Sequence, residues 1–180
     1  ALLAAPPLSA QLDSALLKLA RVLAYQHKYS ESITRYEQYL KAHPKDTKAR
    51  FEFGEVLFWN KDYDRALIQF ETASNDKRFF VKSKKYEAQI LSIKGEREKA
   101  DQILEKIVDV QPADSNTRLT YARNLSYQQR YDESLKQYEI MLAASPDDKA
   151  ALLGKAEALS WARRYKESAD TYDKLLFVQP

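Results

Sequence analysis

The sequence predicts an all-α fold of stacked helix pairs, and three observations support that prediction. Proline recurs at a fixed spacing, at Pro44, Pro112, Pro146 and Pro180, with Arg78 at the one place in the series where proline is missing. Other columns of residues repeat with the same step, 34 residues, without insertion or deletion. Glycine is scarce, with 3 in 180 residues, which favours helices over turn-rich β structure. A fixed period in this range indicates a solenoid.

The repeated columns differ in side-chain size. Two hold small residues: Ala20, Gly54, Ala88, Ala122 and Ala156, and then Ser32, Ala66, Ala100, Ser134 and Ser168. Two hold larger ones: Leu23, Leu57, Leu91, Leu125 and Leu159, and then Tyr36, Phe70, Leu104, Tyr138 and Tyr172. We expect the small columns where two helices approach closely and the larger ones in the space between repeats.

The last copy of the pattern shows how one repeat folds. Leu152 and Leu159 fall at helical spacing on one stripe, and the stripe breaks at Arg163. A second stripe follows and ends at Pro180, because the residue before a proline disfavours helix. One repeat is therefore predicted to be two amphipathic helices joined by a short polar turn.

Five such repeats follow a short lead-in. The predicted boundaries are 1–12 for the lead-in and 13–46, 47–80, 81–114, 115–148 and 149–180 for the repeats. The lead-in has two interpretations, the remnant of a secretory signal or the end of a preceding helix stopped by Pro6 and Pro7.

The columns resemble the tetratricopeptide repeat, over residues 13–180. The resemblance implies an α-solenoid that forms a right-handed superhelix, with the first helix of each repeat lining a concave groove. The pattern departs where a large residue is usual, at Arg50, Lys84, Arg118 and Glu87. The third repeat departs most, so we expect it to be the weakest link in the stack and the first to open in hydrogen exchange.

Composition argues against catalysis. There is no cysteine, and His27 and His43 fall at turns without a ligand at metal spacing. The glycines are isolated and form no phosphate loop. With 29 basic and 26 acidic residues, the net charge of +3 is too balanced for a nucleic-acid footprint. We therefore expect no enzyme activity, no cofactor, no metal and no nucleic acid.

Binding is the better prospect, because an aromatic ladder falls on the expected groove face. Its column is Tyr25, Trp59, Ile93, Tyr127 and Trp161, which includes both tryptophans of the chain. Phe58 adjoins it, and an ionic column lies one helical turn earlier: Arg21, Glu55, Gln89, Arg123 and Glu157. We predict groove binding by Tyr25, Trp59, Tyr127, Trp161, Phe58, Arg21, Arg123, Glu55 and Glu157. The alternative is that the ladder packs against the following helix. The lysine and asparagine pairs of chaperone-tail binders in this family are missing.

A basic cluster marks the junction of the second and third repeats. Its members are Lys77, Arg78, Lys82, Lys84 and Lys85, with Phe79 and Phe80 among them. One interpretation is a patch for an anionic partner, whose affinity would fall with salt. The other is a solvated turn with two aromatic rings tucked into the core.

These features favour a non-catalytic scaffold that holds a partner polypeptide in its groove. One alternative is a carbohydrate-contacting module that stacks sugar rings on the ladder, with polysaccharide as partner. The local sequence around Trp59, Tyr127 and Trp161 also resembles repeats of bacterial envelope proteins that serve export or outer-membrane assembly, exopolysaccharide export included. That resemblance implies a periplasmic or outer-membrane-associated protein, against a cytoplasmic adaptor or co-chaperone. The last repeat has no polar cap, which predicts self-association or continuation into a longer chain.

Overall fold

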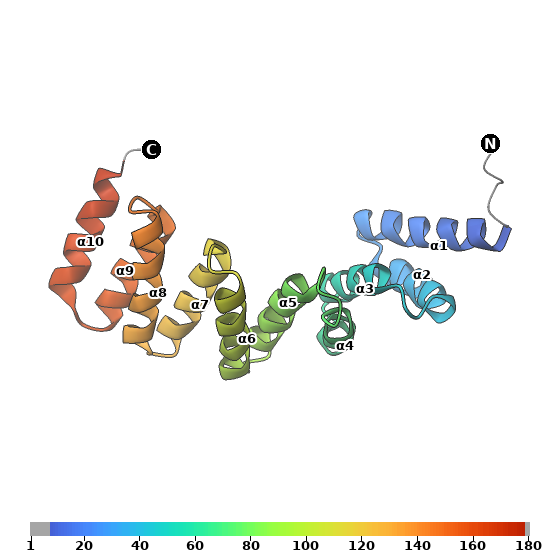
Figure 1. The fold of residues 1–180 in the computed structure, drawn as a ribbon, viewed down its shortest axis with the longest axis horizontal. Coiled ribbons are helices and arrows are strands. Elements are labelled where there is room, and N and C mark those ends of the chain that lie inside the picture. The colour runs from blue at the N-terminus through green and yellow to red at the C-terminus, as the bar shows by residue number, and fades with distance from the viewer. Residues whose placement is uncertain (1–7, 179–180) are drawn as a thin grey trace. The chain divides into compact units, whose positions relative to one another are not determined.

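The computed structural model describes residues 8–178, and these residues form ten α-helices and no strand (Figure 1). The helices are α1 (Leu8–Tyr25), α2 (Tyr29–Ala42), α3 (Thr47–Trp59), α4 (Tyr63–Ala73), α5 (Phe80–Ile93), α6 (Arg97–Val110), α7 (Ser115–Tyr127), α8 (Tyr131–Ala144), α9 (Lys149–Trp161) and α10 (Tyr165–Phe177). Successive helices form five helix-turn-helix repeats. The predicted all-α fold of repeated helix pairs is confirmed.

The turn inside each repeat has the same backbone in all five copies. One residue of each turn has a positive φ, between 59° and 83°, at His27, Lys61, Gly95, Gln129 and Arg163. The next residue donates its N–H to the carbonyl of the leucine column at 2.8–2.9 Å, so each first helix ends in a Schellman motif. This bond holds the left-handed residue in place even though four of the five carry a side chain.

First helices begin at an aspartate in three of the five repeats. Asp46, Asp114 and Asp148 cap α3, α7 and α9, with a side-chain oxygen accepting from backbone N–H groups at 2.9–3.1 Å. Each aspartate lies two residues after a proline of the recurring series. In the third repeat Phe80 occupies the aspartate position, so α5 begins without this aspartate signal.

The chain divides into two compact bodies, the N-terminal half (Ala1–Ile90) and the C-terminal half (Leu91–Pro180). The boundary falls inside α5, in the repeat whose sequence departs most from the pattern.

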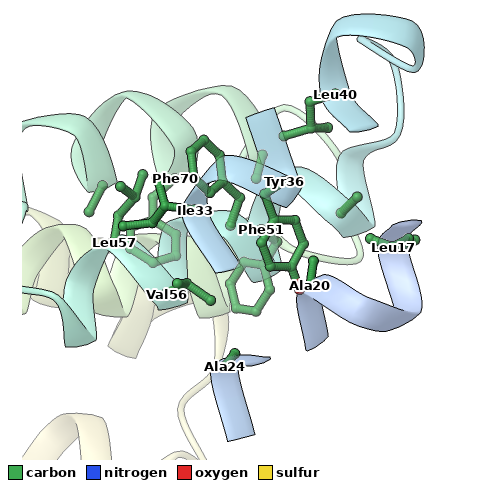
Figure 2. Packing of buried hydrophobic residues seen from close by; sticks show 14 of the residues in the cluster. Leu17, Ala20, Ala24, Ile33, Tyr36, Leu40, Phe51, Val56, Leu57 and Phe70 are labelled. Atoms are coloured by element: carbon green, nitrogen blue, oxygen red, sulfur yellow. The ribbon is translucent and has the colours of Figure 1, made fainter. Parts of the chain in front are cut away.

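The core of the N-terminal half is rich in aromatic rings. Figure 2 shows Tyr36, Phe51, Val56 and Phe70 among the side chains of this cluster, and all four are buried. In the C-terminal half a second cluster is centred on Tyr138, Met141 and Leu159 together with small residues of α7 and α9.

The two small-residue columns lie where the helices of one repeat touch, as the sequence predicts. Ala20, Ala122 and Ala156 are completely buried, and each offers its carbonyl to a serine of the second helix. The pairs are Ser32 with Ala20 at 2.7 Å, Ser134 with Ala122 at 2.7 Å and Ser168 with Ala156 at 2.8 Å. A larger side chain in either column would separate the helices and break this bond.

Two arginines that break the sequence pattern have a structural role. Arg50 donates to the Gln69 side chain at 2.9 Å and to the Pro44 carbonyl at 2.7 Å. Arg118 makes the same two contacts, to Gln137 at 2.6 Å and to Pro112 at 3.4 Å. Each arginine therefore joins the inter-repeat turn to both helices of its repeat, where the sequence suggested only the loss of an apolar contact.

The N-terminal lead-in is partly helical. α1 begins at Leu8, so residues 8–12 belong to the first helix and not to a separate lead-in. The choice between a signal remnant and the end of a preceding helix falls on residues 1–7, which lie outside the described residues.

Candidate functional site

The aromatic ladder occupies the last position of four first helices. Tyr25 ends α1, Trp59 ends α3, Tyr127 ends α7 and Trp161 ends α9, and their exposed fractions are 80%, 43%, 62% and 45%. Each ring is thus placed by the Schellman turn that follows it and keeps a large part of its surface available to a partner.

The two tryptophans also pack against neighbouring rings. In the N-terminal half Trp59 lies 6.3 Å from Tyr29, measured between ring centroids. In the C-terminal half Trp161 lies 5.7 Å from Tyr127, so two rungs of the ladder touch each other. Packing and exposure coexist at these positions, as expected for amphipathic aromatic residues.

Phe58 does not share this arrangement. Its ring lies 5.7 Å from Tyr63 and 5.2 Å from Tyr86, and it packs against the aromatic core as a half-buried residue. The prediction that Phe58 adds to the exposed ladder therefore needs correction, because its neighbours draw it inward.

In the N-terminal half the predicted ionic column is held by specific bonds. Arg21 donates hydrogen bonds to both carboxylate oxygens of Glu52, from Nε at 2.8 Å and from Nη2 at 3.1 Å. Glu55 accepts a hydrogen bond from the Tyr86 hydroxyl at 3.0 Å. Burial raises the pKa of Glu55, and that hydrogen bond opposes the rise. These groups are positioned before any ligand arrives.

The ionic column of the C-terminal half is more open. Arg123 is exposed at the surface of α7, and Glu157 is half-buried on α9. Both lie on the same first-helix face as the Tyr127–Trp161 pair, one helical turn earlier. Here the column offers a cation and an anion beside two aromatic rings.

A continuous trough runs along the first helices of the N-terminal half. A cavity of about 570 Å³ lies between α3 and α5, and an adjoining one of about 330 Å³ lies between α1 and α3. The two share Lys48, Glu52 and Glu55 in their walls. The larger cavity has an aromatic floor of Phe51, Phe79 and Tyr86, whereas the smaller one reaches the ladder. We call these joined cavities the trough.

The predicted basic patch is divided by the structure. Lys82 and Lys85 line the trough, whereas Lys84 turns away and pairs with the buried Glu87 at 2.7 Å. Arg78 pairs with Asp76 at 2.7 Å and lies 5.7 Å from the Phe79 ring, while Lys77 is exposed. The five basic residues therefore lie in three different environments: the trough, ion pairs with acidic side chains, and the exposed surface.

Sequence reasoning missed three contributors to this site. Lys48, Phe79 and Tyr86 line the trough but were not singled out as binding residues. The signal was present for one of them, because Lys48 and Lys82 occupy the same column in consecutive repeats. The other two could be recognised only once the ring contacts of Phe51 were known, at 5.2 Å to Phe79 and 6.0 Å to Tyr86.

Across residues 8–178 no three histidine, cysteine or acidic side chains cluster in a way that suits a metal ion. Nor does any helix in the described part of the chain have the length and apolarity to cross a membrane.

The family is shown by comparison with known proteins. A tetratricopeptide repeat model matches residues 17–76 and 119–179, one stretch in each half, and passes over the third repeat. No curated protein matches the chain in sequence.

Several solved structures share the fold. YrrB, described as a TPR protein with an unusual peptide-binding site, is 18% identical with a TM-score of 0.72, covering 92% of this chain and 85% of YrrB. MamA residues 41 to the end from Desulfovibrio magneticus RS-1 is 13% identical with a TM-score of 0.79, covering 92% and 94%. MamA AMB-1 is 19% identical with a TM-score of 0.76, covering 92% and 91%. Together with the family model, which spans more than half of the sequence, these findings show that the chain belongs to the tetratricopeptide repeat family.

Proposed function

We propose that this chain is a non-catalytic scaffold that binds a partner polypeptide along the first helices of its repeats. The observation that carries the proposal is the trough, an open cavity with an aromatic floor and fixed charges beside the exposed Trp59. Membership of the tetratricopeptide repeat family and the fold it shares with the peptide-binding YrrB support it.

The lining of the trough suits a polypeptide because it combines apolar rings with ionic groups. An extended peptide presents successive side chains to opposite faces, so one face can meet rings while its backbone and polar side chains meet Glu55 and Lys48. Aromatic and arginine side chains supply a large share of binding energy at protein interfaces.

Selection from a random-peptide display library on the immobilised chain tests the proposal. Selected peptides should bind the parent and lose about thirtyfold or more in affinity for Trp59→Ala, since truncating an anchoring aromatic costs about 2 kcal/mol or more. Ile68→Ala is the matched control, because Ile68 is 57% exposed but lies on the second helix α4. Equal binding by both variants, or no selected peptide at all, would contradict the proposed site.

A second candidate is carbohydrate binding, which the C-terminal half favours. Tyr127 and Trp161 touch at 5.7 Å and remain 62% and 45% exposed, so they offer adjoining flat faces for sugar rings. Titration with oligosaccharides in a Trp59→Phe background leaves Trp161 as the only fluorescent tryptophan. A saturable change that Tyr127→Ala abolishes would favour the sugar over the peptide.

Two finer parts of the proposal concern the cell. We place the scaffold in the bacterial envelope, as part of an assembly or export complex, because the local sequences around Trp59, Tyr127 and Trp161 resemble one another and repeats of envelope proteins. Fractionation of cells that carry the full reading frame tests this, and recovery with cytoplasmic markers would favour the adaptor or co-chaperone alternative. Self-association through α10, whose Leu176 and Phe177 are 81% and 84% exposed, is tested by light scattering.

A further inference from the structure

The charges around the trough are unequal. Four basic residues and only two carboxylates, Glu52 and Glu55, line the trough. The basic residues are Arg21, Lys48, Lys82 and Lys85. Glu52 is already neutralised, because Arg21 holds both of its oxygens and the Tyr36 hydroxyl donates to it at 3.3 Å. Lys48 and Lys82 therefore face one remaining carboxylate, and the trough favours an anionic ligand.

The remaining carboxylate argues against an unbroken row of ligand charges. Glu55 lies in the wall shared by the two cavities and accepts from Tyr86. A nucleic-acid strand, which carries a phosphate at every residue, would place negative charge against it. A polypeptide can instead put a neutral or apolar side chain there and keep its acidic side chains for the lysines.

The aromatic floor sets the second requirement. Phe51 and Phe79 are stacked at 5.2 Å, and Tyr86 meets Phe51 edge-on at 6.0 Å, so the rings are held in place before binding. Lys82 and Lys85 lie on the same helix as Tyr86. An apolar side chain on this floor would thus have acidic neighbours within reach of lysine amines.

The repeat period sets the spacing of those acidic neighbours. Lys48 and Lys82 occupy one column, and their helices α3 and α5 touch through Phe51 and Tyr86. Contacting helices lie about 8–10 Å apart. An extended chain advances about 3.3 Å per residue and points successive side chains to opposite faces, so acidic side chains two residues apart lie on one face, about 7 Å apart, within reach of the two flexible lysines.

We propose that the trough binds an acidic extended segment of a partner protein, with carboxylates on Lys48 and Lys82 and an apolar side chain on the Phe51, Phe79 and Tyr86 rings. The inference rests on the proposed peptide-binding function and names the class of peptide.

Fluorescence anisotropy with the whole chain tests it. Three short labelled peptides of leucine and serine would carry glutamate, glutamine or lysine in pairs two residues apart. The glutamate peptide should bind about tenfold tighter than the glutamine peptide, since each exposed ion pair contributes a modest amount and there are two, at Lys48 and Lys82. Its affinity should also fall as salt rises from low to physiological concentration.

Charge reversal locates the site. Lys48→Glu/Lys82→Glu should lose the glutamate peptide and gain the lysine peptide, and Lys48→Gln/Lys82→Gln should show the same loss in a milder form. Lys45→Glu/Lys77→Glu changes the net charge equally, at exposed positions that do not line the trough. This control should bind as the parent does.

Four results would overturn the inference. They are equal binding of the glutamate and glutamine peptides, binding of none of the three, equal loss in the Lys45→Glu/Lys77→Glu control, and tighter binding of a single-stranded oligonucleotide than of the glutamate peptide. Equal binding of the glutamate and glutamine peptides that still depended on Trp59 would leave the proposed peptide-binding function standing. Loss of library-selected peptides as well would remove both.

Discussion

The first helices α3 and α7 hold equivalent places, one in each half, but they bury different chemistry. α3 buries Phe51, Phe53, Val56 and Leu57 among its core residues, whereas α7 buries Thr117, Arg118, Tyr121 and Ser126. Both helices keep the repeat length, the aspartate cap and the arginine that reaches the proline. The repeat period therefore fixes the backbone of each repeat, whereas the buried side chains that stabilise it can differ between repeats.

The neighbouring contacts follow the same division. In the N-terminal half Phe70 stacks on Tyr86 at 4.6 Å, within a set of touching rings. In the C-terminal half the Ser126 and Ser134 hydroxyls lie 2.6 Å apart, and Ser134 donates to the Ala122 carbonyl. We expect the first half to depend on ring volume and the second on hydrogen bonds. Because each half holds one tryptophan, replacing the other with phenylalanine lets each unfold under its own fluorescent reporter.

The largest effect is expected from Phe70→Ala. Phe70 is completely buried, and removing a buried phenylalanine ring costs about 3–5 kcal/mol of the free energy of unfolding. Urea unfolding followed by Trp59, in a Trp161→Phe background, measures that loss. The control is Leu104→Ala in the same column, which should act on the Trp161 transition. A loss under about 1 kcal/mol would refute the dependence on ring volume.

Arg118→Lys tests the hydrogen-bonding side of the comparison. Lysine cannot reach Gln137 and the Pro112 carbonyl together, so we expect the C-terminal half to lose about 1–2 kcal/mol. Arg50→Lys makes the same change at a more exposed position and should cost less. Urea midpoints of the two variants check the order, and a larger loss for Arg50→Lys would reverse our account.

Gly154→Ala sets helix propensity against packing. An added Cβ would lie 2.5 Å from the Tyr138 hydroxyl oxygen, and such overpacking costs about 1–3 kcal/mol. Alanine returns about 1 kcal/mol as the better helix former, so a net loss near 1 kcal/mol is expected. Thermal unfolding of the variant measures it. If the contact is the cause, Gly154→Ala should cost nothing more in a Tyr138→Leu background.

The smallest effect is a pH dependence at Asp101, a buried carboxylate in a column that is otherwise mostly leucine or isoleucine. Burial raises its pKa, against a hydrogen bond from Gln128 and the charge of Arg130. Between the unfolded value, about 4, and the raised folded value, the folded state binds the proton more readily, so stability falls as pH rises.

Asp101→Asn should therefore raise stability at neutral pH and flatten this slope, as urea unfolding between acidic and neutral pH would show. Glu167→Gln is a control of opposite sign, because the hydrogen bond from Arg164 lowers the pKa of Glu167 and its contribution is lost on acidification. An unchanged slope in Asp101→Asn would show that burial of this carboxylate has no cost.

Much of the fold follows from the sequence because the repeat period reports directly on helix packing. The small columns lie where helices touch, and the first helix ends at the ladder column in all five repeats. The division into two halves did not follow from periodicity, since the columns continue through α5 without a gap.

The candidate site was less accessible to sequence reasoning, because side-chain pairing is a property of three-dimensional neighbours. The pattern gave Lys82, Lys84 and Lys85 as one patch. On a helix, however, side chains three residues apart, such as Lys82 and Lys85, share a face, whereas Lys84 lies on another. Glu87 draws Lys84 away, while the other two lysines stay on the trough. The same limitation applies to Phe58, whose orientation is decided by Tyr63 and Tyr86.

The arginine bridge decides how this array can be cut and rejoined. Arg50 takes one acceptor from the loop before its helix and another from the helix after it, so a chimera cut at helix ends would separate the donor from an acceptor. A transplantable cassette runs from the proline to the glutamine, over 44–69 or 112–137. These two cassettes should exchange freely. Placed over the third repeat, where Arg78, Lys84 and Ile103 stand at the three positions, either would install a complete bridge in one step.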